Sequence, residues 1–368
     1  MSAIALLQLA VAGLLAASGP LAYAWVRSDG DRYRKLVWIA TFLTFDLILF
    51  GAFTRLTDSG LGCPDWPGCY GHSNPIAAKA HIDAAQAAMP TGPVTVSKAW
   101  IEMTHRYFAM GVGVLIMTMM AIAWVRRASL RRSPWPATGL FVLVCLQGAF
   151  GAWTVTLKLM PAIVTLHLLL GIALLCALGA FGAREQARAP EQLRTLALLA
   201  LAVVFAQIAL GGWVSTNYAV LACQDFPLCN GALVPQADFA RGFDLTRPLG
   251  MNDDGSLLPV QALVAIHWVH RVSAIAVVLV VSVLIVALAR AGGPMTRIAW
   301  TLAGLLSLQI ASGVSNILFA WPLAVAVVHT GGAAALALSI AMLCVRVCAP
   351  LHDGSPDGVL FSAARARA

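Results

Sequence analysis

Nine apolar stretches run through this sequence, and each is long enough to cross a membrane as a helix. A helix needs about 20 predominantly apolar residues to span a bilayer. Hydrophobic residues make up 60% of the 368 residues and charged residues only 11%, with a mean hydropathy of +0.82. A soluble chain is about one quarter charged, so the composition predicts an all-α integral membrane protein. The predicted spans are 3–26, 36–56, 100–124, 136–156, 161–182, 194–216, 259–289, 297–318 and 322–345.

Basic residues are concentrated in alternate connections between these spans. They gather at 27–35, 126–132, 184–194, 290–297 and from 346 onward. Because cytoplasmic connections carry an excess of Lys and Arg, these connections are predicted to be cytoplasmic. The net charge of +8 then reflects topology and gives no indication of nucleic-acid binding.

The remaining connections include two long ones, 57–99 and 217–258, which are predicted to face outward. An apolar stretch at the N-terminus can be a cleaved signal. Here no basic residue precedes the first stretch and a basic cluster follows it. We therefore expect a retained helix with its N-terminus outside.

The second half of the chain repeats the first. LFGAFTRLTDSGLGCPDWPGCYG at 49–71 parallels ALGGWVSTNYAVLACQDFPLCNG at 209–231, and LQGAFG at 146–151 parallels LQIASG at 308–313. Each repeat contains four spans in the same topology, which predicts two tandem pseudo-symmetric four-helix transmembrane bundles plus one extra N-terminal transmembrane helix. The predicted units are 1–35 (extra N-terminal helix and cytoplasmic link), 36–183 (N-terminal bundle), 194–346 (C-terminal bundle) and 347–368 (cytoplasmic tail).

Four histidines lie inside the spans and form two matching pairs. His105 in EMTHRYF matches His270 in HWVHRVS, and His167 in IVTLHLLLG matches His329 in AVAVVHTGG. An ionisable residue inside a membrane is costly and is usually functional. In each half the histidines occupy the second and fourth spans, which are diagonal partners in a four-helix bundle. The diagonal measures roughly 12–14 Å when neighbouring axes lie about 8–10 Å apart.

Two imidazoles with an iron porphyrin between them fill such a distance, so each half is predicted to hold one haem by bis-histidine ligation. The alternative for each histidine is a hydrogen bond to a neighbouring helix. Zinc would require three or four ligands close together, which diagonal pairs do not offer. The sequence has no C-x-x-C-H motif, which excludes covalent c-type attachment.

Charged residues accompany the histidines. Glu102, the only glutamate inside a span, lies three residues before His105 on the same helix face, whereas the second half has His267 at this position. We therefore predict a reactive site in the first half and an electron-transfer or structural site in the second. Arg106 and Arg271 directly follow their histidines. They are predicted to pair with haem propionates, the alternative being that they extend to the membrane interface.

Two pairs of cysteines lie in the outward connections, Cys63 with Cys69 and Cys223 with Cys229. In a bacterial periplasm these pairs would be oxidised, so one disulfide is predicted in each loop. A strained or exposed disulfide has a higher reduction potential, and the sequence leaves open whether either bridge takes part in redox chemistry.

Together, TRLTDSGLGCPDWPGC, EMTHR, the histidine of IVTLHLLLG, VHRVSA and VVHTGGA resemble the haem A synthase family. The resemblance is closest to the bacterial form with a cysteine pair in each large periplasmic loop, and it covers about residues 36–346. It implies oxidation of the C8 methyl of haem O to a formyl, which gives haem A for cytochrome oxidase assembly. It also implies a substrate haem at His105 and His167, a haem b at His270 and His329, and Glu102 as the catalytic carboxylate.

The resemblance implies the bacterial inner membrane as location and haem O, haem A and membrane lipid as partners. Haem O synthase and an electron acceptor are further expected partners, and a homo-oligomer is left open. Two other functions explain part of the pattern. One is a non-catalytic di-haem b-type electron-transfer protein, which would leave Glu102 unused. The other is a quinone-coupled thiol oxidoreductase, which would leave the four histidines unexplained.

Overall fold

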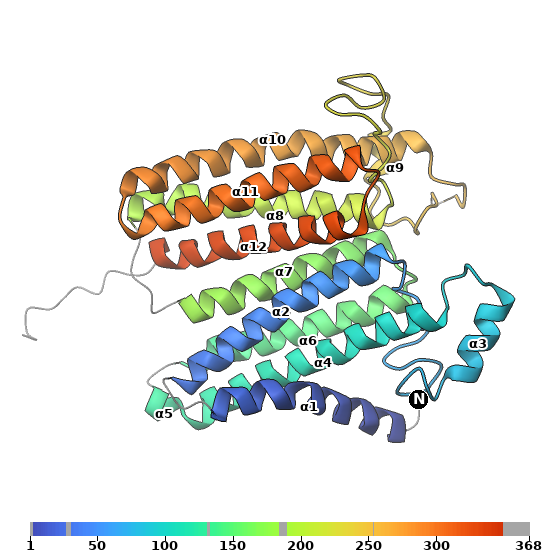
Figure 1. Cartoon of the computed structure of the whole chain (residues 1–368), viewed down its shortest axis with the longest axis horizontal. Helices are drawn as coiled ribbons and strands as arrows, with labels where there is room; N and C mark the ends of the chain where they lie inside the picture. The colour runs from blue at the N-terminus through green and yellow to red at the C-terminus, as the bar shows by residue number, and fades with distance from the viewer. Residues whose placement is uncertain (1–2, 27–30, 131–132, 184–189, 253, 349–368) are drawn as a thin grey trace, which may run out of the picture.

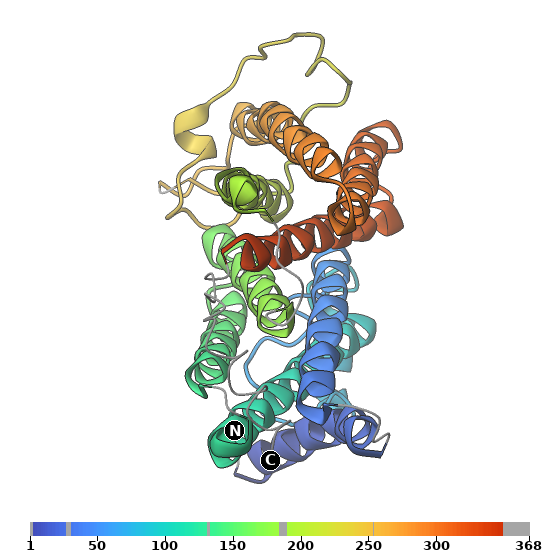
Figure 2. The same ribbon diagram turned by 90° about the vertical axis from the view of Figure 1, so that its left-hand side faces the viewer.

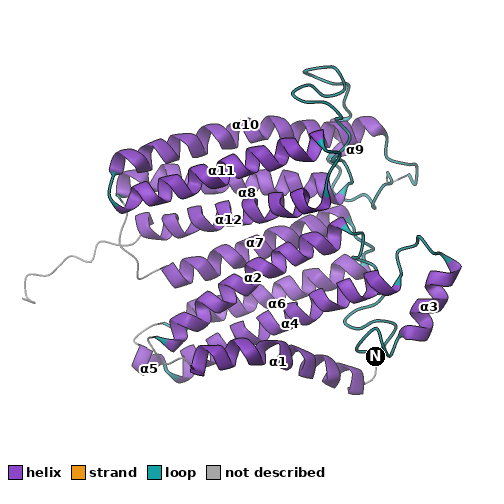
Figure 3. Cartoon of the chain, viewed as in Figure 1, coloured by secondary structure: helices purple, strands orange, loops and turns teal. Residues whose placement is uncertain are grey.

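The computed structural model describes residues 3–26, 31–130, 133–183, 190–252 and 254–348. Within these residues the regular secondary structure is helical and no strand is formed (Figure 3). Nine of the described helices are long and apolar enough to cross a membrane. The predicted all-α integral membrane fold is therefore confirmed.

The spanning helices run side by side, and the long loops gather at one end of the molecule (Figure 1). Short helices lie in the loops or at the inner ends of the spans: α3 (Lys79–Ala88), α5 (Arg127–Leu130), α9 (Phe239–Gly242) and the 3-10 turn η1 (Glu191–Leu193). The nine spanning helices are α1 (Ala3–Val26), α2 (Arg32–Leu56), α4 (Val96–Val125), α6 (Trp135–Thr156), α7 (Pro161–Ala183), α8 (Arg194–Thr216), α10 (Val260–Ala291), α11 (Pro294–Leu318) and α12 (Leu323–Cys348).

Two helices begin four residues earlier than their apolar stretches predict. α2 begins at Arg32 and α4 at Val96. The side chains of Asp31 and Thr95 accept hydrogen bonds from backbone N–H groups of the first turn. Such caps supply partners for N–H groups that have none within the helix. The helix therefore continues past the apolar stretch, which hydropathy alone does not detect.

The spanning helices form two closed rings (Figure 2). In the first ring α2 and α6 each contact both α4 and α7, and in the second α8 and α11 each contact both α10 and α12. The helices that bear histidines, α4 with α7 and α10 with α12, are thus the diagonal pairs. The two rings meet where α7 and α12 pack together, with α2 against α12 and α7 against α8. α1 lies outside the first ring, against α4 and α2.

Fully buried apolar side chains fill the inner half of each ring. In the first ring Leu115 and Met119 of α4 are buried, and in the second Leu284 and Leu288 of α10. Leu115 follows His105 by ten residues, which is about 15 Å along a helix. The packed cores therefore lie away from the histidines, which occupy the outer half of each ring beneath the loops.

Candidate functional site

Each of the four histidines lies against a glycine of a neighbouring helix in its own ring. If a Cβ atom were added at any of these glycines, it would lie closer to the Cε1 atom of the imidazole than Cβ atoms in proteins normally lie to their neighbours. Protein interiors are closely packed, so a larger residue would displace the ring. The separations are 3.1 Å for Gly51 and His105, 3.2 Å for Gly151 and His167, 3.0 Å for Gly211 and His270, and 3.2 Å for Gly313 and His329.

Within each ring the two histidines stand on diagonal helices, His105 on α4 with His167 on α7, and His270 on α10 with His329 on α12. All four histidines are half-buried. The Nδ1 atoms of His105 and His167 are buried and have no hydrogen-bond partner among the described residues. The accessible surface of these two residues therefore belongs to their other atoms.

This donor set suits a haem iron. Among the described residues, no group of three or more His, Cys, Asp or Glu side chains is placed to hold a metal ion, so a tetrahedral zinc site has no support. Two imidazoles from diagonal helices are the axial ligands that a b-type haem uses. A ligating imidazole binds through one of its nitrogens, and because Nδ1 of His105 and of His167 is buried, Nε2 is the nitrogen left for the iron.

Three of the four histidines are also held through their backbone. A glutamine of the neighbouring helix donates to the histidine carbonyl, and it stands four residues before the glycine described above. This Q-x-x-x-G pattern occurs three times among the helices, and the fourth copy has Leu47 in place of glutamine. This pattern is not among the features predicted above from the sequence, although the repeat makes it visible. The bonds run from Gln147 to His167 at 2.9 Å, from Gln207 to His270 at 3.0 Å, and from Gln309 to His329 at 3.0 Å.

The second half adds polar partners at the imidazoles themselves. Nδ1 of His270 lies 3.1 Å from the Gln207 side-chain nitrogen, and Nδ1 of His329 lies 2.8 Å from Oγ of Ser312. In the first half both Nδ1 atoms lack a partner among the residues the structure describes. The two histidine pairs are therefore equivalent in position and different in hydrogen bonding.

Glu102 is buried, with 4% of its surface exposed. Its carboxylate accepts a hydrogen bond from the backbone N–H of Cys63 at 2.7 Å and forms an ion pair with Arg106. The carboxylate thus lies between α4 and the first disulfide loop, one helical turn from His105.

His267 occupies the matching place in the second half. Its Nδ1 lies 3.3 Å from the backbone nitrogen of Cys223, and its Nε2 lies 3.1 Å from Nε of Arg271. Both ring nitrogens face the loop and its arginine, so His267 is the loop-binding counterpart of Glu102. This leaves His270 as the imidazole of α10 that interacts with His329.

Arg106 and Arg271 hold the outward loops onto α4 and α10. Their guanidinium groups donate to backbone carbonyls of the disulfide loops, and Arg106 is itself buried. Pairing with haem propionates stays a prediction. The carbonyl acceptors are those of Asp65, Pro67 and Gly68 for Arg106, and those of Cys223, Asp225 and Leu228 for Arg271.

Disulfides join Cys63 to Cys69 and Cys223 to Cys229, with Cα separations of 4.9 Å and 4.6 Å. The cysteines pair as predicted, and all four are buried. The first loop is docked closely onto α4, because a Cβ at Gly62 would lie 2.4 Å from the backbone carbon of Lys98.

An aspartate organises the backbone inside each disulfide loop. Asp65 accepts from the N–H groups of Tyr70 and Gly71, at 2.6 Å and 2.7 Å. Asp225 accepts in the same way from Gly231, at 2.9 Å, and from the residue before it. These N–H groups stabilise the charged carboxylate and lower the pKa of Asp225. The loop geometry is therefore repeated down to its backbone hydrogen bonds.

The two halves also bond to each other at their outer ends. The Arg55 guanidinium donates to the carbonyl of Ser215 at 2.6 Å, and the Tyr218 hydroxyl donates to the Asp58 carboxylate at 2.6 Å. In both bonds the partners are 160 positions apart, which is also the offset between the cysteine pairs. Equivalent positions of the repeat therefore meet across a pseudo-two-fold axis. The sequence analysis missed this contact.

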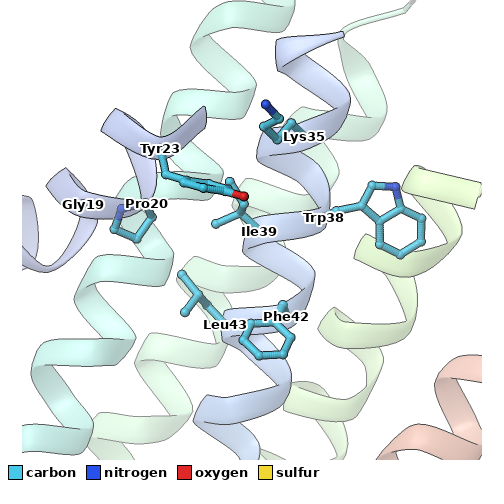
Figure 4. Close-up of a pocket in the computed structure, with 8 residues that line it drawn as sticks. All are labelled: Gly19, Pro20, Tyr23, Lys35, Trp38, Ile39, Phe42 and Leu43. Atoms are coloured by element: carbon cyan, nitrogen blue, oxygen red, sulfur yellow. The ribbon is translucent and has the colours of Figure 1, made fainter. Parts of the chain in front are cut away.

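A separate groove lies between α1 and α2 (Figure 4). It is almost wholly apolar and is lined by residues that include Pro20, Trp38 and Phe42, with Lys35 at its margin. Tyr23 in α1 and Lys35 in α2 lie near the inner ends of their helices. The groove is therefore remote from the histidines.

The fold and the site define a multi-pass membrane protein built from two repeated four-helix units, each with a facing histidine pair beneath a disulfide loop. Residues 34–341 match the family described as cytochrome oxidase assembly protein, and the chain belongs to this family. This confirms the family that the sequence motifs resemble.

Curated relatives agree with the family match. The chain is 38% identical to a protein named "Heme A synthase" from Shewanella oneidensis, over 83% of this chain and 94% of the relative. It is 31% identical to the protein of that name from Caulobacter sp. strain K31, over 89% and 99%. It is 30% identical to that from Caulobacter vibrioides, over 85% and 95%.

Proposed function

We propose that this protein is a haem A synthase, which oxidises the C8 methyl of haem O to a formyl and so supplies haem A for cytochrome oxidase assembly. The observation that carries the proposal is the buried carboxylate of Glu102, placed one helical turn from His105 in one ring only. Membership of the cytochrome oxidase assembly family and the names of the relatives support it.

The N-terminal ring is assigned to the substrate and the C-terminal ring to a resident cofactor. His105 and His167 would bind haem O, and His270 and His329 would bind a haem b. The bound haem b supplies one-electron redox chemistry. The assignment rests on the difference between the halves, because the charged Glu102 accompanies only the first histidine pair.

Glu102 is suited to the chemistry at the methyl group. Oxidation of a methyl group requires loss of protons and passes through electron-poor carbon, and a carboxylate in a water-poor site can accept a proton or stabilise positive charge. The Cys63 N–H and the Arg106 guanidinium hold the carboxylate in one orientation. Such fixed groups need no reorganisation when charge develops.

The location and partners follow from the same assignment. The membrane would be a bacterial inner membrane with the disulfide loops in the periplasm, where cysteine pairs are oxidised. Haem O synthase would deliver the substrate, and an electron acceptor would receive the electrons. Arg106 directly follows His105 and Arg271 directly follows His270 in the sequence. We assign these two arginines to the propionate groups of the two haems.

The test is conversion of haem O by the purified full-length protein, followed by extraction and chromatography of the pigments. Glu102→Gln keeps an acceptor for the Cys63 N–H but removes the charge. We expect it to retain bound haem and to form haem A about 10²- to 10⁴-fold more slowly. Glu191→Gln, an exposed change in η1, is the matched control and should convert normally.

Three outcomes would contradict the proposal. Normal conversion by Glu102→Gln would remove its catalytic role. A red wild-type protein that forms no haem A would indicate an electron carrier. A colourless protein would favour a thiol oxidoreductase built on the disulfide loops.

A further inference from the structure

The hydrogen bonding of His329 fixes which of its nitrogens can bind iron. The Ser312 hydroxyl has one proton, which it donates to the carbonyl of Leu308 at 2.6 Å. Its oxygen therefore faces Nδ1 of His329, 2.8 Å away, as an acceptor. With the hydroxyl proton on the Leu308 carbonyl, the nearer of its two carbonyl acceptors, Nδ1 donates and carries the imidazole proton, which leaves Nε2 with the free lone pair that a metal ligand needs.

The first half has no equivalent of this hydroxyl. In the aligned segments LQGAFG and LQIASG, Phe150 stands where Ser312 stands. Nδ1 of His167, the counterpart of His329, is buried without a partner among the described residues. The other two histidines do not repeat this difference, because the side-chain nitrogen of Gln207 beside Nδ1 of His270 can only donate, so that Nδ1 would accept, and Leu47 stands at the matching place near His105.

We propose that the hydrogen bond between Ser312 and His329 decides which haem the protein keeps. Ser312 is a positioning residue that holds His329 in its iron-binding tautomer, so the C-terminal haem is retained. The N-terminal imidazoles are not held in this way, so their haem is exchanged. The inference rests on the proposed function and deepens it, because a cofactor has to stay bound and a product has to leave.

Metal sites in other proteins indicate how much faster haem should be lost when the bond between Ser312 and His329 is removed. A group that hydrogen-bonds the second nitrogen of a ligating histidine fixes the ring orientation and raises its basicity. Loss of such a partner typically weakens metal binding about 10- to 100-fold. The glycine and glutamine contacts are shared by His167 and His329, so Ser312 is the difference between them.

The experiment measures loss of haem from the full-length protein in detergent to excess apomyoglobin. The protein is loaded with haem O, and the pigments left in it are chromatographed over time, so that haem O together with any haem A formed from it reports the first ring and haem b the second. In the wild type we expect haem O to leave faster than haem b. Ser312→Ala should release haem b about 10- to 100-fold faster and leave the loss of haem O unchanged.

Three further variants separate positioning from packing. Ser312→Thr keeps a hydroxyl and should retain haem b like the wild type. Phe150→Ser places a hydroxyl at the equivalent position of the first ring and should slow the loss of haem O. Ser339→Ala removes a hydroxyl of α12 that bonds the Ala335 carbonyl, away from the histidine, and should change neither rate.

The inference is overturned if haem b is lost equally fast from Ser312→Ala and the wild type, or if haem O is retained as long as haem b. A wild-type protein that binds neither pigment would instead overturn the proposed function. The two failures are therefore distinguishable in one experiment.

Discussion

The two halves hold their disulfide loops in the same way but with different side chains. In the first, the Cys63 N–H and Arg106 meet the carboxylate of Glu102, and in the second the Cys223 N–H and Arg271 meet the imidazole of His267. A neutral imidazole has one acceptor nitrogen, so His267 can accept from only one of its two donors, whereas the Glu102 carboxylate accepts from both of its donors. Only the first of these two matching positions carries a carboxylate, which is the reason for assigning the chemistry to Glu102.

The halves differ in a second respect, which concerns the histidines. Each of the four histidines has the same kind of glycine contact, whereas among the described residues partners at Nδ1 are found in the second half alone. The repeat therefore fixes where the four histidines stand, and under the proposed function the less regular neighbours would set how firmly each haem is held.

The largest expected effect comes from removing one ligand in each half. His329→Met should shift or abolish the low-spin spectrum of haem b, because a thioether replaces an imidazole at the iron. His167→Met, the matched change in the first half, should leave that spectrum intact and weaken binding of haem O. Absorption and electron paramagnetic resonance spectra of both purified variants check this. An unchanged spectrum for His329→Met, or loss of haem b from His167→Met, would reverse the assignment of the halves.

A smaller effect should follow from crowding the first loop. In Gly62→Ala the new methyl would lie 2.4 Å from the Lys98 backbone, so the loop must move off α4. We expect a cost of about 1–3 kcal/mol, as for other overpacked sites, together with reduced haem A formation because Cys63 holds Glu102. The thermal unfolding midpoint and the pigment assay measure both effects.

The second half provides the control for this change. It already has Ala222 at the position that corresponds to Gly62. Ala222→Gly should therefore cost no more than about 1 kcal/mol and leave conversion unchanged. Equal behaviour of the two variants would show that the close docking of the first loop is unimportant.

The features predicted from the sequence are those that depend on the order and spacing of residues along the chain. Apolar length identified the nine spans, and the repeat identified the four histidines and the two cysteine pairs. The side-chain partners were not predictable in this way. Arg106 and Arg271 reach loop carbonyls, and which carbonyls they meet depends on the path of each loop in space. The contact of Arg55 with Ser215 likewise requires the rings to be placed against each other.

The smallest expected effect concerns the bond between the halves. Tyr218→Phe removes the hydroxyl that donates to Asp58 but keeps the ring on which the Arg55 guanidinium lies, 4.1 Å from its centre. A hydrogen bond contributes about 0.5–1.5 kcal/mol to stability, and Asp58 is largely exposed, so we expect the lower end of this range. Thermal unfolding of the detergent-solubilised protein measures the loss.

A double-mutant cycle with Asp58→Asn isolates the bond, since residues in contact show a coupling that independent sites lack. Tyr23→Phe, on α1 and remote from the boundary between the rings, is the control and should show no coupling. Absence of coupling between Tyr218 and Asp58 would mean that this bond does not hold the rings together, and that the packing of α7 and α2 against α12 and of α7 against α8 does so. Measurable coupling would mean that the outer ends, where both histidine pairs lie, are also fixed relative to each other.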